Sequence, residues 1–244
     1  MVNISTLYKV TNLAIMELMP SLYYQRVFVP GCYYHVYNRG AHQQNIFQDD
    51  QDYQTFTEIL GYYLIHPSGI AQSILNRKAK DYKVTNLVKD PPSCAVLAYC
   101  LMPNHFHLML KQLSQELTIS DLMRRVSIGY AMYYNDRYHH SGTIFQGRYK
   151  NILITNEYQW VYLSKYIHRN PMHLQSYEPC KLLNYTYSSY PNYLGKRQND
   201  WLDTSTFLDR YHKNPPQEYQ DFVEDGGDVG NIEKITIDVN EEQG

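Results

Sequence analysis

Two histidines are the residues of this sequence whose type and spacing most clearly suggest chemistry. His105 and His107 are separated by one residue in a segment that alternates polar and apolar side chains. Residues i and i+2 of a strand project from the same face, so both imidazoles can bind one cation while Phe106 faces the core. Taken alone, the pattern is more typical of two half-exposed histidines on a polar sheet face than of a metal site.

A second group lies in the segment that ends at Pro171. Tyr166 and Asn170 are four residues apart and therefore share one face of a helix. The Asn170 amide oxygen is a candidate third ligand, and nitrogen and oxygen ligands suit Mg²⁺ or Mn²⁺, although two histidines also tolerate Zn²⁺. A metal ion polarises a phosphodiester, and a tyrosine one turn away can attack the phosphorus and form a phosphotyrosine. Tyr162, one turn earlier, is the rival nucleophile.

The elements that must position these residues follow from hydrophobic periodicity and turn signals. The expected strands comprise residues 32–37, Cys94–Met102, His105–Lys111 and Ile144–Thr155. The expected helices begin at Asp49 or Asp50, at Ser120 and at Asn156. A turn is expected at residues 38–40. This order predicts an α+β fold with a ferredoxin-like split βαβ antiparallel sheet and an added C-terminal helix that carries the tyrosine.

The rest of the chain divides by composition. We expect an N-terminal leader over residues 1–27, the main domain over 28–195 with an insertion at about 67–92, and an extension over 196–244. Residues 203–244 contain 11 acidic and 3 basic residues, a balance of −8. We therefore expect disorder beyond about Pro215.

The net charge of −2 is unevenly distributed along the chain, and the main body is mildly basic. Removing the acidic tail leaves 19 basic and 13 acidic residues in positions 1–202, which permits contacts to phosphates. Candidates for such contacts are Arg39, Arg148 and Lys150, with Asn38 beside the first of them.

The remaining composition favours a cytoplasmic protein. No apolar stretch approaches the length of a membrane span, and the first residues lack the basic start of a secretory signal. The four cysteines have no CxxC spacing, so they are expected to be reduced thiols rather than a zinc site or a disulfide framework.

Several motifs occur together in one order. They are Tyr37-Asn38-Arg39-Gly40, Leu101-Met102-Pro103-Asn104-His105-Phe106-His107-Leu108-Met109-Leu110, Phe145-Gln146-Gly147-Arg148-Tyr149-Lys150, Lys165-Tyr166-Ile167-His168-Arg169-Asn170-Pro171 and Tyr187-Ser188-Ser189-Tyr190. This set, spread over about residues 30 to 195, resembles the single-tyrosine HUH transposases. The Asn-Pro ending and the Tyr-Ser-Ser-Tyr segment resemble their REP-associated branch.

The resemblance implies an enzyme that nicks and rejoins single-stranded, hairpin-forming DNA through a 5′-phosphotyrosine. In it Tyr166 is the nucleophile, His105 and His107 are metal ligands, and Asn170 is the third ligand to Mg²⁺ or Mn²⁺. REP-associated relatives imply a monomer, whereas mobile relatives are dimers. The alternatives are a relaxase or replication initiator of the HUH class, and a non-catalytic DNA-binding regulator derived from such an enzyme.

Overall fold

The computed structural model describes residues 26–68, 91–174 and 182–226. Four strands in this part of the chain form one sheet in the order β2-β3-β1-β4. The strands are β1 (Tyr33–Arg39), β2 (Cys94–Met102), β3 (His105–Gln112) and β4 (Lys150–Ile154). Every neighbouring pair is antiparallel, so the expected α+β fold with an antiparallel sheet is confirmed.

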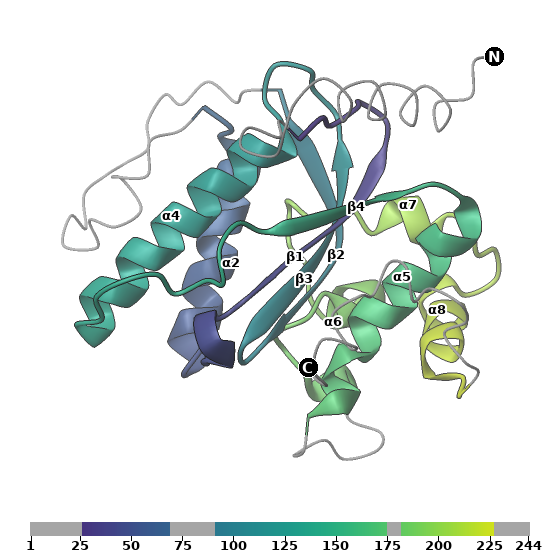
Figure 1. The fold of residues 1–244 in the computed structure, drawn as a ribbon. Helices are drawn as coiled ribbons and strands as arrows, with labels where there is room; N and C mark the ends of the chain where they lie inside the picture. The colour runs from purple at the N-terminus through teal and green to yellow at the C-terminus, as the bar shows by residue number, and fades with distance from the viewer. Residues whose placement is uncertain (1–25, 69–90, 175–181, 227–244) are drawn as a thin grey trace, which may run out of the picture.

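Two long helices connect the strands (Figure 1). Helix α2 (Asp50–Ile65) joins β1 to β2, and α4 (Ile119–Tyr138) joins β3 to β4. This element order, combined with the strand order, is that of a split βαβ unit. Asp49 is the N-cap of α2, as expected, because its side chain accepts hydrogen bonds from two backbone N–H groups of the first turn. Helix α5 (Glu157–Arg169) follows β4 as the added helix.

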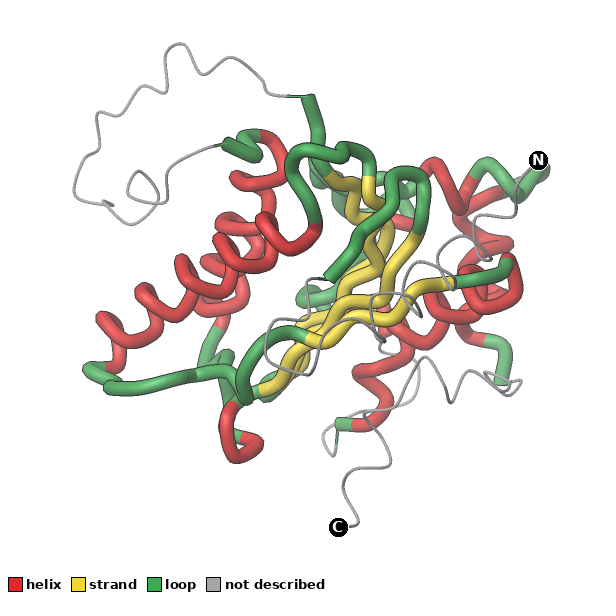
Figure 2. The backbone as a smooth tube through the Cα atoms, turned by 45° about the horizontal axis from the view of Figure 1, so that its top comes forward, coloured by secondary structure: helices red, strands yellow, loops and turns green. Residues whose placement is uncertain are grey.

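The sheet lies between two groups of helices (Figure 2). Helices α2 and α4 cover one face, where Phe106, Leu108 and Leu110 of β3 belong to the larger hydrophobic core. Helix α5 covers the other face, and Met109 of β3 joins Leu163 of α5 in a second core. The expected alternation of β3 is therefore confirmed, and it leaves the histidine-bearing face toward α5.

Short elements complete the described chain. They are the 3-10 helices η1 (Ala41–Gln43), η2 (Asn170–His173) and η3 (Leu182–Asn184), and the helices α6 (Tyr190–Tyr193), α7 (Ser205–Leu208) and α8 (Pro215–Glu224). Among the described residues, no helix has the length and apolar character needed to cross a membrane.

The expected turn at residues 38–40 is wrong for its first two members. Asn38 and Arg39 extend β1, because both pair with β3. The expected strand at Ile144–Thr155 is too long, since β4 begins only at Lys150 and ends at Ile154. Before β4, Phe145 makes one isolated bridge to Gly40, the residue after β1, and the chain then turns at Gly147, whose φ of +92° interrupts extended backbone.

The start of α4 also differs from expectation. Thr118, not Ser120, is the N-cap residue. The Thr118 backbone N–H donates to the Asp121 carboxylate at 3.0 Å, while the Asp121 N–H donates back to the Thr118 carbonyl at 2.9 Å. This reciprocal pair satisfies backbone donors that a helix start leaves unpaired, so the helix begins at Ile119.

The expectation of disorder beyond about Pro215 is wrong for residues 215–226. Helix α8 forms there, and Tyr219 and Val223, one turn apart, are both fully buried. The Tyr219 hydroxyl is also hydrogen-bonded to the ring of His168 in α5 at 2.8 Å. Two buried side chains and one tertiary hydrogen bond order a segment whose composition is acidic and polar. The expected leader, most of the expected insertion and the end of the acidic tail lie outside the described residues.

Candidate active site

The site is built on the face of β3 that α5 covers. His105 and His107 both project to this face, and the centroids of their rings lie 5.0 Å apart with the ring planes nearly perpendicular. Phe106 between them is buried in the opposite core, as the alternation predicts. The structure thus brings the two histidines together at one place.

Each of the two rings has its Nδ1 occupied by a protein partner. Nδ1 of His105 lies 2.6 Å from the amide oxygen of Asn104, and Nδ1 of His107 lies 2.9 Å from Nε2 of His35. An amide oxygen only accepts hydrogen bonds, so Nδ1 of His105 carries the proton and Nε2 keeps its lone pair. For a histidine that is to bind a metal ion, this is the required tautomer.

Burial keeps both imidazoles neutral. Removal from water lowers the pKa of His105 to about 4, although the nearby Asn170 side chain acts in the opposite direction. Burial also holds the pKa of His107 well below its usual value, and the neighbouring His105 and His35 rings add to this effect. Metal binding requires neutral imidazoles, so both rings are ready to act as ligands at neutral pH.

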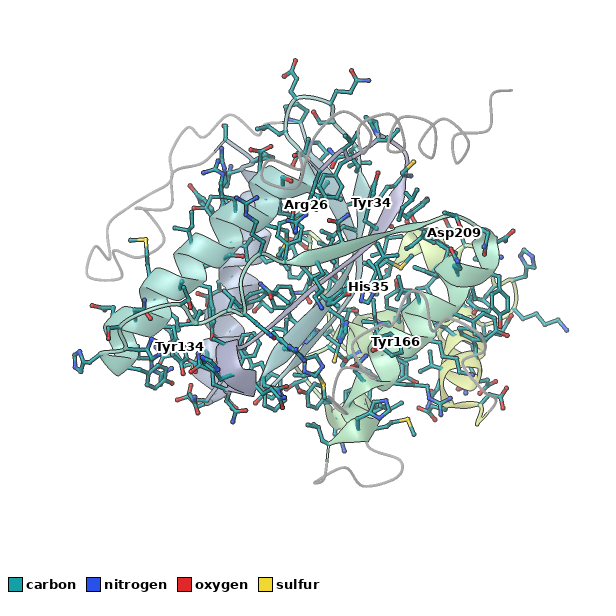
Figure 3. All side chains as sticks on the ribbon, viewed as in Figure 1. Arg26, Tyr34, His35, Tyr134, Tyr166 and Asp209 are labelled. Atoms are coloured by element: carbon teal, nitrogen blue, oxygen red, sulfur yellow. The ribbon has the colours of Figure 1, made fainter. Side chains whose placement is uncertain are left out.

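Helix α5 brings Tyr166 and Asn170 to the same place. The helix begins after Asn156, whose side chain accepts from the Gln159 N–H at 2.8 Å, and it ends before Pro171. The Tyr166 ring lies edge-on to His107, with the ring centroids 5.5 Å apart. Figure 3 shows Tyr166 on α5 together with His35 on the sheet, and their ring centroids are 6.2 Å apart.

The Asn170 amide is oriented by its own helix. Its nitrogen donates to the Tyr166 carbonyl at 3.0 Å, which leaves the amide oxygen available. The Asn170 side chain lies within hydrogen-bonding reach of His105, whose Nδ1 is already taken by Asn104. The Asn170 amide oxygen and Nε2 of His105 are both acceptors, and a cation bound to both would satisfy them.

The donor set fits a divalent metal ion. Nε2 of His105, Nε2 of His107 and the amide oxygen of Asn170 are nitrogen and oxygen ligands of the kind that Mg²⁺ and Mn²⁺ accept at phosphate sites. In the described ranges, no group of three or more His, Cys, Asp or Glu side chains is arranged to hold a metal ion. The Asn170 amide oxygen is a candidate third ligand of another type.

Tyr162, the rival nucleophile, has a different environment. Its ring packs against Tyr158, with centroids 4.2 Å apart, and against Phe222 of α8, with centroids 5.8 Å apart. Both contacts lie on the α8 side of the helix. Tyr166 is the one of the two tyrosines that contacts the histidine rings.

Two of the candidate cations flank the site. Arg39 is the register partner of His105, and Lys150 is the register partner of Tyr37, which in turn lies opposite His107. The Lys150 ammonium lies 5.8 Å from the centroid of the Tyr37 ring. Arg39 is therefore on the strand directly beside the histidines and Lys150 is one strand further away, and both lie on the same face of the sheet as the histidines.

The other two candidates for DNA contact lie elsewhere. Arg148 lines a groove beside α4, on the opposite face of the sheet, together with Arg124. Asn38 is buried, and its amide nitrogen donates to the Gly147 carbonyl at 3.2 Å. This bond attaches the turn that precedes β4 to β1, so Asn38 holds the turn that carries Arg148.

The Tyr-Ser-Ser-Tyr segment supports the site from the sheet edge. It pairs with β2 through the Tyr187 carbonyl and the Ser189 N–H, each in a backbone hydrogen bond of 2.9 Å. The Ser189 hydroxyl lies 2.7 Å from Nε2 of His168, which is fully buried two residues after Tyr166. The interpretation of His168 as a structural residue is supported, because it connects α5 to this segment and to α8.

His35 is the residue that the motifs did not assign to the site. The sequence predicts that His35 lies on a strand, but it does not show which residue of a neighbouring strand lies opposite. From the sequence alone, packing is therefore the simpler interpretation of His35. The available signal was the alternation of Tyr33, His35 and Tyr37, which becomes informative once β1 is known to pair with β3. His173, in η2 after Asn170, is also close enough to lower the pKa of both His105 and His107 by charge repulsion.

Comparison with known structures gives weak overall likenesses. One is a REP-associated tyrosine transposase bound to a REP hairpin, with 13% identity, a TM-score of 0.47, and coverage of 75% of this chain and 94% of the other. Another is a protein of Deinococcus radiodurans R1 described as a transposase, with 15% identity, a TM-score of 0.35, and coverage of 61% and 97%. A third is tRNA(His) guanylyltransferase of Saccharomyces cerevisiae, with 7% identity, a TM-score of 0.38, and coverage of 92% and 82%. These values are too low to transfer an activity or a ligand.

Sequence comparison is more informative. No curated protein matches the chain. Residues 72–170 match the family model described as "Transposase IS200 like". The matched stretch runs from before β2 to the end of α5, and it contains His105, His107, Tyr166 and Asn170. Over residues 72–170, the chain is therefore similar to the IS200-like transposases.

Proposed function

We propose that this protein is a metal-dependent DNA strand transferase that nicks and rejoins single-stranded, hairpin-forming DNA through a covalent bond to Tyr166. The observation that carries the proposal is the convergence of Tyr166 and Asn170 of α5 with His105 and His107 of β3. The match of residues 72–170 to the IS200-like transposase family model supports the same class of reaction.

The proposed step is a transesterification at one phosphodiester. The phenolic oxygen of Tyr166 attacks the phosphorus, the bond to the 3′ oxygen breaks, and the phenolic proton is lost as the 3′-hydroxyl forms. The product is a 5′-phosphotyrosine and a free 3′-hydroxyl. A 3′-hydroxyl can then attack the phosphotyrosine in the reverse sense, which rejoins DNA and releases Tyr166. One phosphodiester bond is exchanged for another in each direction, so no external energy source is needed.

His105, His107 and Asn170 would hold the metal ion. When bound, Mg²⁺ or Mn²⁺ supplies a Lewis acid that offsets negative charge on the scissile phosphate. The chain's own residues do the positioning. The rings of His35 and His107 pack against the Tyr166 ring and restrict its motion. Tyr166 is only 8% exposed, so few orientations of the phenol are open to it.

Cations along the neighbouring strands are proposed to hold the DNA backbone. Arg39 and Lys150 flank the histidines on the same face of the sheet, where they can contact phosphates on either side of the scissile bond. Arg148 is proposed to contact DNA outside the site, from the turn that Asn38 holds. Hairpin DNA as the substrate, and action as a monomer, rest on the REP-associated motifs of the sequence.

The test is the covalent adduct. Hairpin and single-stranded oligonucleotides from the protein's genomic neighbourhood, labelled at the 5′ or 3′ end, are incubated with the full chain and Mg²⁺ or Mn²⁺. Tyr166→Phe should abolish the adduct while retaining DNA binding, because the Phe ring keeps the same packing. Tyr162→Phe is the matched control on the same helix and should retain the adduct.

The site of attachment separates the alternatives. Mapping of the DNA-linked peptide to Tyr162 would overturn the assignment of the nucleophile but not the class of enzyme. Cleavage that depends on helicase activity or on a second tyrosine would favour a relaxase or replication initiator. DNA binding without an adduct, with either metal and all the oligonucleotides, would favour the non-catalytic regulator.

A further inference from the structure

His35 makes a contact that the proposed reaction does not yet use. It is 1% exposed in the middle of β1, between its register partners Met109 of β3 and Ile152 of β4. Its Nε2 lies 2.9 Å from Nδ1 of His107, and the two rings are close to parallel, with centroids 5.1 Å apart. The aromatic rings of Tyr37 and Tyr166 lie against it on the same face.

This contact couples the position of the proton on His107 to the position of the proton on His35. One of the two facing nitrogens must donate and the other must accept. If Nδ1 of His107 donates, its Nε2 keeps a lone pair and can bind a metal ion. If Nδ1 of His107 accepts, its Nε2 is protonated and cannot bind one. His107 can therefore present Nε2 to a metal ion only when His35 accepts, whereas the acceptor-only amide oxygen of Asn104 fixes the tautomer of His105.

We propose that His35 is a positioning residue for the metal centre: its Nε2 accepts the hydrogen bond from Nδ1 of His107 and so presents Nε2 of His107 to the cation. The inference rests on the proposed function for its metal ion. Hydrogen-bond partners of metal-bound histidines fix the orientation of the ring and raise its affinity as a ligand. The two ligand histidines are then held in the same way, one by an amide oxygen and one by an imidazole nitrogen.

The test compares two substitutions of His35 by their effect on metal affinity in the absence of DNA. His35→Phe keeps the ring and removes the acceptor. His35→Gln places an amide oxygen at about the position of Nε2 and restores the acceptor. Mn²⁺ binding to the full chain, measured by calorimetry, should weaken about 10- to 100-fold in His35→Phe and stay within a few-fold of wild type in His35→Gln. A folded His35→Phe variant with wild-type affinity would overturn the inference.

A measurement on the unaltered protein covers the case in which His35→Phe does not fold. Nitrogen-15 NMR of the labelled histidines reports which ring nitrogen carries the proton, and the His107 signals are assigned by their loss in His107→Ala. The expected result is a protonated Nδ1 and an unprotonated Nε2 on His107. The opposite tautomer would refute the role of His35.

The outcomes separate this inference from the proposed function. A wild-type chain that binds Mn²⁺ and forms the adduct, together with a His35→Phe variant that does both equally well, removes only the role of His35. A wild-type chain that binds no Mn²⁺ and forms no adduct removes the proposed function and the metal-positioning role together.

Discussion

Removal of the Tyr219 hydroxyl should destabilise the fold measurably, although Tyr219 lies in a segment of acidic, polar composition. Tyr219→Phe keeps the ring, which stacks on Tyr193 with centroids 4.4 Å apart. The substitution removes the hydroxyl, which lies 2.8 Å from Nδ1 of His168 and is also hydrogen-bonded to the Ser164 side chain. His168 is fully buried, so water cannot replace the lost partner.

The size of the effect follows from the cost of an unsatisfied buried group. Leaving one ring nitrogen of a neutral, buried His168 without a partner costs about 1–3 kcal/mol. For a chain of this size, that corresponds to a fall in Tm of roughly 2–12 °C. Because His168 also contacts Ser189, the loss is expected to loosen the attachment of α5 as well as that of α8.

The assay is urea denaturation of the full chain followed by circular dichroism, with the thermal midpoint as a second measure. Tyr158→Phe is the matched control, because Tyr158 is 49% exposed on α5 and its substitution should change stability by less than about 0.5 kcal/mol. Equal stability of Tyr219→Phe and the control would refute the contribution of the hydrogen bond between Tyr219 and His168 to the stability of the fold. Truncation after Asn214, which removes all of α8, should destabilise more than Tyr219→Phe.

Further predictions concern the site and its ligands. His105→Ala or His107→Ala should abolish both Mn²⁺ binding and the DNA adduct with an unchanged circular dichroism spectrum; an adduct at wild-type yield would contradict the ligand assignment. With a chelator present to remove metal ions, the free energy of unfolding should fall as the pH is lowered from about 6.5 toward 4. The reason is that the unfolded chain binds protons that the folded chain excludes from His105, with a pKa of about 4, and from His168, with a pKa of about 3. A flat profile over that range, measured by urea denaturation, would show that these rings are not buried and neutral. Hairpin affinity should fall as salt rises, and Lys150→Ala should reduce the slope of the logarithmic plot by about one; an unchanged slope would exclude a phosphate contact at Lys150.

Local pattern predicted much of the fold and of the site. The apolar run from Cys94 to Met102 is β2 in the structure, and the alternation that follows it places both histidines on one face. The four-residue spacing of Tyr166 and Asn170 places them on one face of α5. Such features depend on the periods of a strand and a helix, which are properties of neighbouring residues and need no knowledge of the rest of the fold.

The contacts between elements could not be predicted in this way. His35 faces His107 only because β1 pairs with β3 in one particular register, and a shift by one residue would turn His35 to the opposite face of the sheet. The same register makes Asn38 and Arg39 part of β1, where the sequence alone predicts a turn.

The C-terminal segment shows the same difference between what the sequence predicts and what tertiary contacts decide. By itself, the sequence of residues 215–226 is acidic and weakly apolar, and it predicts disorder. In the structure Tyr219 and Val223 are buried against α5, and His168 supplies a hydrogen-bond partner from a helix about fifty residues away in the chain. The sequence alone predicted the candidate ligands, the candidate nucleophile and the elements that carry them. The tertiary structure decided which side chain faces His107 and what holds α5 in place, because both depend on contacts between residues far apart in the chain.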